Sequence, residues 1–210
     1  MEAAGQAFRV EGSSRDIRGC FRCHSTGPVT VSSRREIGIT EAGVRCEVCH
    51  GPGRAHVEAA GRGNSQQTRL AIRHPRSMSA DAQLRFCGSC HRSPDGGEAA
   101  NDFTNAWNVR HQPPYLEQSK CFRASAGMLT CFTCHAPHDS LRRADPQHYR
   151  AKCATCHNAD RRPPAAVCRS DSSSDCTTCH MPSVQPDRRL SFRNHWIGVY
   201  RSGASLIPAR

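Results

Sequence analysis

The pattern Cys-x-x-Cys-His recurs six times in this chain of 210 residues, and it limits what the chain can fold into more than any other feature. The copies occupy residues 20–24, 46–50, 87–91, 131–135, 153–157 and 176–180. Only 37% of the residues are hydrophobic and 6% are aromatic, which is little material for a conventional core. We therefore expect a cofactor, a metal or a set of disulfides to brace the interior.

The spacing within each copy indicates covalently bound haem c. Two thiols separated by two residues add across the two vinyl groups of a porphyrin, and the imidazole that follows reaches the iron as an axial ligand. We expect six such haems. The attachment residues are Cys20, Cys23, Cys46, Cys49, Cys87, Cys90, Cys131, Cys134, Cys153, Cys156, Cys176 and Cys179. The axial ligands within the motifs are His24, His50, His91, His135, His157 and His180.

Zinc and disulfides explain the pattern less well. Paired cysteines also hold structural zinc, but tetrahedral zinc does not require a histidine directly after every second cysteine. Cysteines separated by two residues usually serve redox or metal chemistry, and disulfides between them would close only very short loops. Haem attachment accounts for every copy of the motif, and it uses twelve of the fourteen cysteines.

Two cysteines and two methionines outside the motifs have open roles. In an oxidising compartment Cys121 and Cys168 could form a disulfide, and a pair of buried free thiols is the alternative. Met128 and Met181 could supply a thioether to iron, which would raise its potential. Packing against porphyrin faces is the simpler interpretation of both methionines.

Six histidines remain once the motif histidines are subtracted from the twelve, and six irons have six second axial positions. The candidates for these positions are His56, His74, His111, His138, His148 and His195. The alternative for each is a hydrogen-bonded or exposed histidine that binds no metal. A histidine next to one motif commonly serves a different haem, so the sequence alone does not assign the pairs.

The chain is strongly basic, with a formal net charge of +11 and a pI near 9.3. Such values also suit nucleic-acid binding. Six haems would add about twelve propionate groups, however, and arginine binds carboxylates well. The basic residues are spread along the chain instead of forming one arm, which favours a solvated surface. We expect redox proteins, and further copies of the chain, as partners.

Haem is attached to cysteine outside the cytoplasm, so we expect a periplasmic or extracellular protein. Residues 1–4, Met-Glu-Ala-Ala, open a polar segment that lacks the apolar stretch of an export leader. We therefore expect that a leader has been removed. The sequence contains no apolar run of the length needed to span a membrane.

The expected fold is mostly α with extensive irregular loops, a compact multihaem fold in which stacked haems form the core. We divide the chain into an N-terminal extension at 1–19, a hexahaem domain at 20–199 and a C-terminal tail at 200–210. Strand patterning is almost absent, with one hairpin expected at 27–39. Loops are expected at 61–67, 93–98 and 160–175.

Local signals predict three helices. Ser79 has the side chain of a helix N-cap and precedes a predicted helix over 80–90. Asp145 is expected to cap a second helix, in which Pro146 occupies the first turn and Cys153 lies further along. A third helix is expected at 114–122.

Several longer segments carry a more specific resemblance. They are Cys46-Glu-Val-Cys-His-Gly-Pro-Gly-Arg-Ala-His56, Leu116-Glu-Gln-Ser-Lys-Cys-Phe122, Leu129-Thr-Cys-Phe-Thr-Cys-His-Ala-Pro-His138, Asp175-Cys-Thr-Thr-Cys-His-Met-Pro182 and Asn194-His-Trp-Ile197. In this order they resemble multihaem cytochromes related to the tetrahaem cytochrome of ammonia oxidisers and to hydroxylamine oxidoreductase. Many of these relatives are fused to tetratricopeptide repeats.

The resemblance spans roughly residues 20–199 and implies closely stacked haem pairs with mostly bis-histidine iron. It supports His56, His138 and His195 as ligands. Two features depart from the family pattern. Relatives often carry further haem-bearing chain upstream, and the position of His74 tends to lack a histidine, which makes it the weakest of the six candidates.

Three classes of function are compatible with these motifs. Electron transfer is favoured and enzymatic activity is not expected, because an iron with two protein ligands cannot bind a substrate. A reductase acting on nitrite, hydroxylamine or a sulfur oxyanion would need one open iron position. The third class is a subunit of an extracellular cytochrome filament, in which haems would stack across subunit boundaries.

Overall fold

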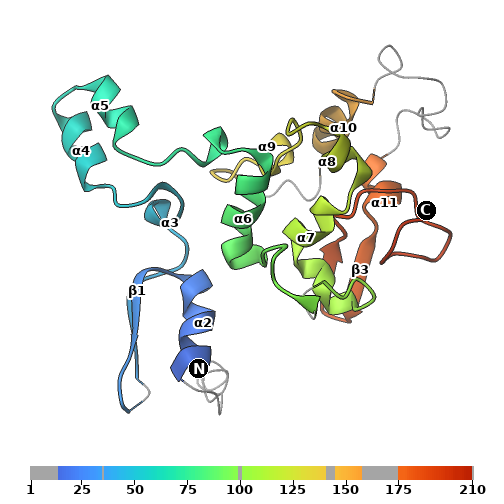
Figure 1. The fold of residues 1–210 in the computed structure, drawn as a ribbon, viewed down its shortest axis with the longest axis horizontal. Helices are drawn as coiled ribbons and strands as arrows, with labels where there is room; N and C mark the ends of the chain where they lie inside the picture. The colour runs from blue at the N-terminus through green and yellow to red at the C-terminus, as the bar shows by residue number, and fades with distance from the viewer. Residues whose placement is uncertain (1–13, 35, 99–100, 141–144, 158–174, 210) are drawn as a thin grey trace. The chain divides into compact units, whose positions relative to one another are not determined.

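The computed structural model describes residues 14–34, 36–98, 101–140, 145–157 and 175–209. Contacts divide the chain into two units, Met1–Ser77 and Met78–Arg210, which we describe separately. Both contain short helices and a small hairpin joined by irregular segments (Figure 1). The fold is thus a mixture of helices and small sheets, with the extensive loops that the sequence predicts.

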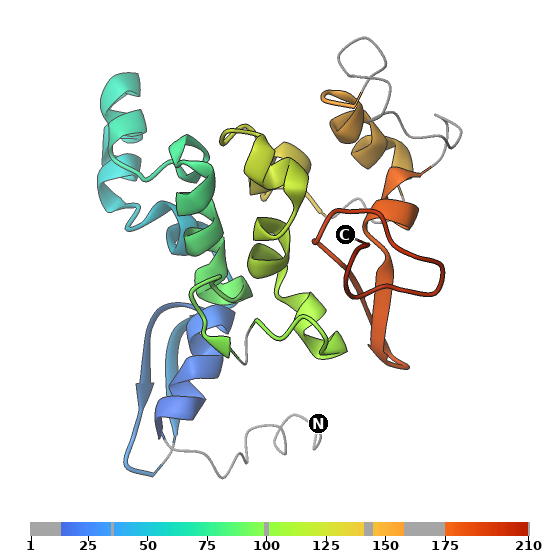
Figure 2. The same ribbon diagram turned by 45° about the vertical axis from the view of Figure 1, so that its right-hand side comes forward.

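The described residues of the first unit form four helices, one antiparallel hairpin and a short 3-10 turn. Its elements are α2 (Ser14–His24), β1 (Ser25–Val31), β2 (Ile37–Ala42), α3 (Cys46–His50), α4 (Arg54–Gly61), α5 (Ser65–Leu70) and η1 (Pro75–Ser77). The hairpin predicted at 27–39 is confirmed, with Val29 opposite Ile39. In Figures 1 and 2 helix α2 lies alongside the hairpin.

Two expectations for the first unit were wrong. Residues 14–19, expected in a loose extension, belong to α2. The loop expected at 61–67 is shorter, because the side chain of Asn64 accepts a hydrogen bond of 3.0 Å from the amide of Gln67 and begins helix α5. Residues 1–13 lie outside the described residues.

The first unit has almost no protein core. Among its described residues only Ser25, Thr26, Ala59 and Pro75 are buried. Folded chains gain most of their stability by removing apolar side chains from water. Four small residues provide little of this stabilisation.

In the second unit, the residues that the structure describes form six helices, a second hairpin and a 3-10 helix. They are α6 (Ala80–His91), η3 (Ala106–Arg110), α7 (Gln112–Glu117), α8 (Lys120–Ala124), α9 (Cys131–Cys134), α10 (Pro146–Ala154), α11 (Cys176–His180), β3 (Ser183–Asp187) and β4 (Leu190–Arg193). Both predicted caps are confirmed. Ser79 accepts a hydrogen bond from Ala82, and Asp145 accepts one from His148.

The second unit also differs from the prediction in two places. The helix expected at 114–122 is two helices, because Ser119 is extended (φ −68°, ψ 128°) and interrupts the chain between α7 and α8. The hairpin of β3 and β4 was not expected, since its strands are short and β3 contains Pro186. The irregular path predicted at 93–98 is confirmed, whereas 160–174 lies outside the described residues.

Two apolar clusters form the core of the second unit. Helices α6, α7 and α8 contribute the buried residues Ala80, Leu84, Leu116 and Phe122, against which Leu129 and Ile197 pack. The other cluster joins Val109, Tyr115 and Val184 with Phe103, Ala106, Phe192, Trp196 and Leu206. These clusters place the C-terminal segment against the α7 region and set the position of His195.

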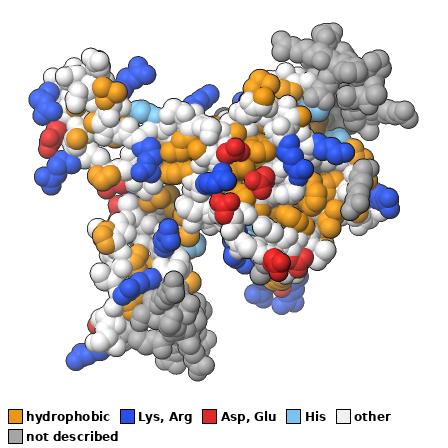
Figure 3. Space-filling view, in the orientation of Figure 1, with side chains coloured by type: hydrophobic (Ala, Val, Ile, Leu, Met, Phe, Trp, Pro, Cys, Tyr) orange, Lys and Arg blue, Asp and Glu red, His pale blue; other side chains and the backbone are white. Residues whose placement is uncertain are grey.

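Charged side chains do not gather into one stripe on the face shown in Figure 3, where Lys and Arg are scattered among neutral, acidic and apolar groups. Hydrophobic side chains are prominent between them on the same face. None of the described helices is both long enough and apolar enough to cross a membrane.

Candidate haem sites

The motifs lie on or directly after helical turns. Helices α3 and α11 each consist of a whole motif, and α2 and α6 each end with one. Helix α9 carries both cysteines of motif 131–135, and α10 carries the first cysteine of motif 153–157. Residues three apart lie on one face of a helix, so a helical turn directs both thiols of a motif to the same side. Such an arrangement suits attachment to one porphyrin.

Backbone carbonyls orient four of the candidate ligands through Nδ1. The pairs are His50 with Arg73 at 2.8 Å, His56 with Thr68 at 2.8 Å, His180 with Gly198 at 2.9 Å and His195 with Arg193 at 3.0 Å. A carbonyl oxygen can only accept, so Nδ1 carries the proton and Nε2 carries the lone pair. This is the tautomer in which histidine commonly binds a metal through Nε2.

His74 is oriented in the opposite way. Its Nε2 donates to the carbonyl of Arg69 over 2.6 Å, which leaves the lone pair on Nδ1. The side chain is exposed. The proposed role of His74 as an axial ligand stays a prediction, and the orientation of its ring is less suited to that role than those of His56 and His195.

The structure brings one motif histidine, His135, together with one histidine outside the motifs, His195. Their ring centres are 6.2 Å apart and the rings are inclined by 32°. Histidine binds metals through bonds of about 2 Å, so two rings on opposite sides of one metal ion have centres about 6 Å apart. This ring separation matches that expected for two histidines that hold one haem iron.

Burial also keeps this pair in the form that binds metals. It lowers the pKa of His195 to about 4, and it lowers the pKa of His135, to which the neighbouring His91 and His148 also contribute. The lowered pKa values favour the neutral form of both rings. Only neutral imidazole has a lone pair available for a metal.

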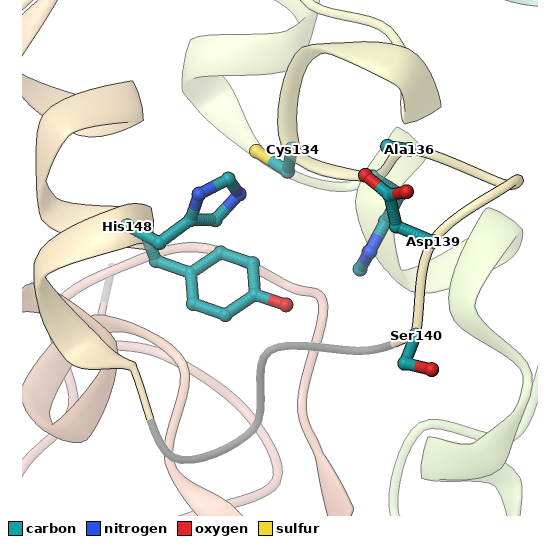
Figure 4. Close-up of a pocket in the computed structure, with 7 residues that line it drawn as sticks. Cys134, Ala136, Asp139, Ser140 and His148 are labelled. Atoms are coloured by element: carbon teal, nitrogen blue, oxygen red, sulfur yellow. The ribbon is translucent and has the colours of Figure 1, made fainter.

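A pocket lies beside His135. It is lined by Cys134, His135, Ala136, Asp139, Ser140, His148 and Tyr149. His148, on α10, lies across the pocket from Ala136, Asp139 and Ser140 (Figure 4). The ring of Tyr149 is perpendicular to that of His148, at 5.1 Å, and lies 6.3 Å from that of His135. The candidate ligand His148 is thus next to a motif, whereas no contact assigns it to one iron.

His111 is the most buried candidate ligand, with 7% of its surface exposed. Its Nδ1 has no hydrogen-bond partner in the part of the chain that the structure describes, and its Nε2 accepts from Arg110 over 3.3 Å. Burial, with smaller contributions from Arg92 and Arg110, lowers its pKa to about 4. A buried polar atom without a partner is costly, which is consistent with a site that a bound group completes.

Attachment cysteines of successive motifs lie next to each other in the second unit. A hydrogen bond joins the thiols of Cys87 and Cys131, lowering the pKa of Cys87 and raising that of Cys131. A second such bond joins Cys153 and Cys176, and burial is the largest cause that raises the pKa of Cys153 to about 12. The first cysteines of motifs 87–91 and 131–135, and of motifs 153–157 and 176–180, are therefore paired.

Three further candidate histidines and the two methionines show no such grouping among the described residues. His138 and His157 are exposed, and so is His24. Met128 is 75% exposed, and Met181 is half-buried. The possible disulfide between Cys121 and Cys168 is untested, because Cys168 lies outside the described residues.

Sequence reasoning missed the residues that hold the candidate ligands in place. Ser119 and Asn194 are fully buried polar residues, and Gly198 accepts the Nδ1 proton of His180. Ser119 and Asn194 both belong to the segments that carry the family resemblance, and this was the available signal. Their function depends on contacts with residues far away in the chain.

The model of one protein family, described as cytochrome c554 and c-prime, matches residues 2–51. The match supports a c-type cytochrome. It covers the first two motifs, 20–24 and 46–50, and therefore implies covalent haem c with iron. No curated protein and no solved structure matches the chain.

Proposed function

We propose that this chain is an electron-transfer protein with six covalently attached c-type haems, each bound by two histidines. The pairing of His135 with His195, at a ring separation that suits two axial ligands of one metal, carries the proposal. Bound haem supplies an iron that takes up and releases one electron. The match of residues 2–51 supports the assignment to c-type cytochromes.

The distribution of histidines supports the same ligation at the other motifs. The first unit contains two motif histidines, His24 and His50, and two others, His56 and His74. The second unit contains four of each kind. Each unit thus has as many additional histidines as motifs, and neither needs to borrow a ligand.

The thiol contacts support the passage of electrons between sites. Cys87 touches Cys131, and Cys153 touches Cys176, so the attachment points of two pairs of haems are adjacent. We propose that electrons move within these two pairs and between them. Because haem c is attached outside the cytoplasm, the partners would be redox proteins of the periplasm or the extracellular space.

Two histidine ligands at every iron leave no position for a substrate, so the proposal includes no enzymatic activity. Bis-histidine ligation also gives a lower potential than histidine with methionine. The exposed position of Met128 and the orientation of His195 favour histidine over methionine at the 131–135 site.

Replacement of His195 tests the proposal. His195→Ala should convert one of six low-spin ferric haems to high-spin and create one carbon monoxide site per reduced molecule. His195→Met is the matched control, since a thioether should restore low-spin iron and raise one potential. Electron paramagnetic resonance and carbon monoxide titration measure both. A high-spin haem that binds nitrite or hydroxylamine in the unmodified protein would instead support a reductase.

A further inference from the structure

One short segment, residues 194–198, contacts the candidate ligands of two different haems. His195 faces His135 of motif 131–135 at a ring separation of 6.2 Å. Three residues later, the carbonyl of Gly198 accepts the Nδ1 proton of His180, in motif 176–180, over 2.9 Å. A displacement of this segment would therefore disturb two iron sites together.

A single hydroxyl group fixes the middle of the segment. Oγ of Ser119 donates to the carbonyl of His195 over 3.0 Å and accepts from the amide of Ile197 over 2.8 Å. Ser119 is completely buried and lies 76 residues from His195 in sequence. It occupies the break between α7 and α8, and its side chain does not cap α8.

Further contacts hold both ends of the segment. The amide group of Asn194 donates to the carbonyls of Ser205 and Leu206 over 2.8 and 2.9 Å, and its oxygen accepts from Trp196. At the other end Gly198 lies so close to Pro208 that a Cβ atom on Gly198 would be 2.6 Å from the proline Cβ. Both ends of the segment are thus held in place, and among the described residues Ser119 provides its hydroxyl-mediated link to the α7–α8 region.

We propose that Ser119 is a positioning residue that sets the ligand geometry, and hence the potentials, of the haems attached at motifs 131–135 and 176–180. The proposal rests on the proposed function, because it takes His195 and His180 as iron ligands. Groups that hydrogen-bond to metal ligands, or that hold their backbone, orient the ring and tune the metal. Ser119 acts on His195 directly and on His180 through Ile197 and Gly198.

The test is a redox titration of the intact six-haem protein, with paramagnetic resonance of the oxidised form. Ser119→Ala should shift two of six midpoint potentials and the two corresponding low-spin signals, leaving four unchanged. Ser119→Thr keeps the hydroxyl and should restore the original values. Ser125→Ala is the matched control, because Ser125 also bridges a carbonyl and an amide, those of Phe122 and Leu129, but does not reach residues 194–198.

Unchanged potentials in a folded Ser119→Ala protein, or an equal effect of Ser125→Ala, overturn the proposal. If Ser119→Ala does not accumulate, Gly198→Ala provides the second test, since the added Cβ must displace the segment from Pro208. It should shift the same two potentials, and six unchanged values would again refute the role of the segment. The proposed function fails separately, if His195→Ala leaves all six haems low-spin.

Discussion

Gly198 and His180 form two hydrogen bonds with each other: Nδ1 of His180 donates to the carbonyl of Gly198, and the amide of Gly198 donates to the carbonyl of His180 over 3.1 Å. The reciprocal pair fixes both the backbone and the ring of a motif histidine. It depends on the absence of a side chain at position 198, where Pro208 occupies the space.

We therefore predict that Gly198→Ala lowers the free energy of unfolding by about 1–3 kcal/mol, the usual cost of forcing an extra carbon into a packed site. Thermal unfolding followed by circular dichroism in the haem absorption band measures the change. Gly19→Ala is the control, because no atom lies within 4 Å of the added carbon and alanine favours the helix that contains it. Equal stability of the two variants would contradict the close contact.

The haem count is predicted from the six motifs. The mass of the intact protein should exceed that of the polypeptide by six haems, and the haems should remain attached after denaturation, because thioether bonds do not depend on the fold. Mass spectrometry under denaturing conditions measures this. Five or fewer haems in fully matured protein would show that one motif is not an attachment site.

The two units should respond differently to the loss of a haem. The first unit buries only four described residues, so Cys46→Ser with Cys49→Ser should leave residues 1–77 open to proteolysis while the second unit resists. Limited proteolysis with mass spectrometry locates the cuts. The matched double change in the second unit, Cys131→Ser with Cys134→Ser, should abolish folded protein. Haem-free protein that is well folded by circular dichroism would refute both expectations.

Acid should release the candidate ligands His111 and His195 only at low pH. The pKa values of His111 and His195 are lowered from 6.5 to about 4, so below pH 6.5 the unfolded chain binds more protons than the folded one. Stability from these groups is complete above pH 6.5 and falls as the pH drops towards 4. Iron would also compete with protons for the ring nitrogens. The low-spin spectrum should therefore persist at pH 5 and change only near or below pH 4. Visible spectra over this range provide the test, and high-spin haem at pH 6 would contradict it.

Two tyrosines, the fully buried Tyr115 and the half-buried Tyr200, provide a matched comparison. The hydroxyl of Tyr115 has no hydrogen-bond partner among the described residues, whereas that of Tyr200 donates to the carbonyl of Trp196. Tyr200→Phe should lower the free energy of unfolding by about 0.5–1.5 kcal/mol, the usual net value of one hydrogen bond, and Tyr115→Phe should be neutral or stabilising. Chemical unfolding of both variants measures the difference. A larger loss for Tyr115→Phe would mean that a bound group accepts its proton.

Much of what the sequence predicted correctly depends on neighbouring residues. Ser79 and Asp145 cap helices because each needs an amide only three positions further on. The hairpin at β1 and β2 is likewise a local structure. The split at Ser119 and the hairpin of β3 and β4 were missed, because contacts with distant segments outweigh weak local preferences at both places.

The six candidate attachment motifs and their histidines are predictions from the sequence alone, since each motif places two thiols and one imidazole within five consecutive residues. The candidate second ligand of motif 131–135, in contrast, depends on residues far apart in the sequence. His195 lies sixty residues after His135, and the hydroxyl that holds it comes from Ser119, a further 16 residues upstream. Only the tertiary structure brought these three residues together. Their separation is set by the path of the chain around the two apolar clusters, which no pattern of adjacent residues reveals.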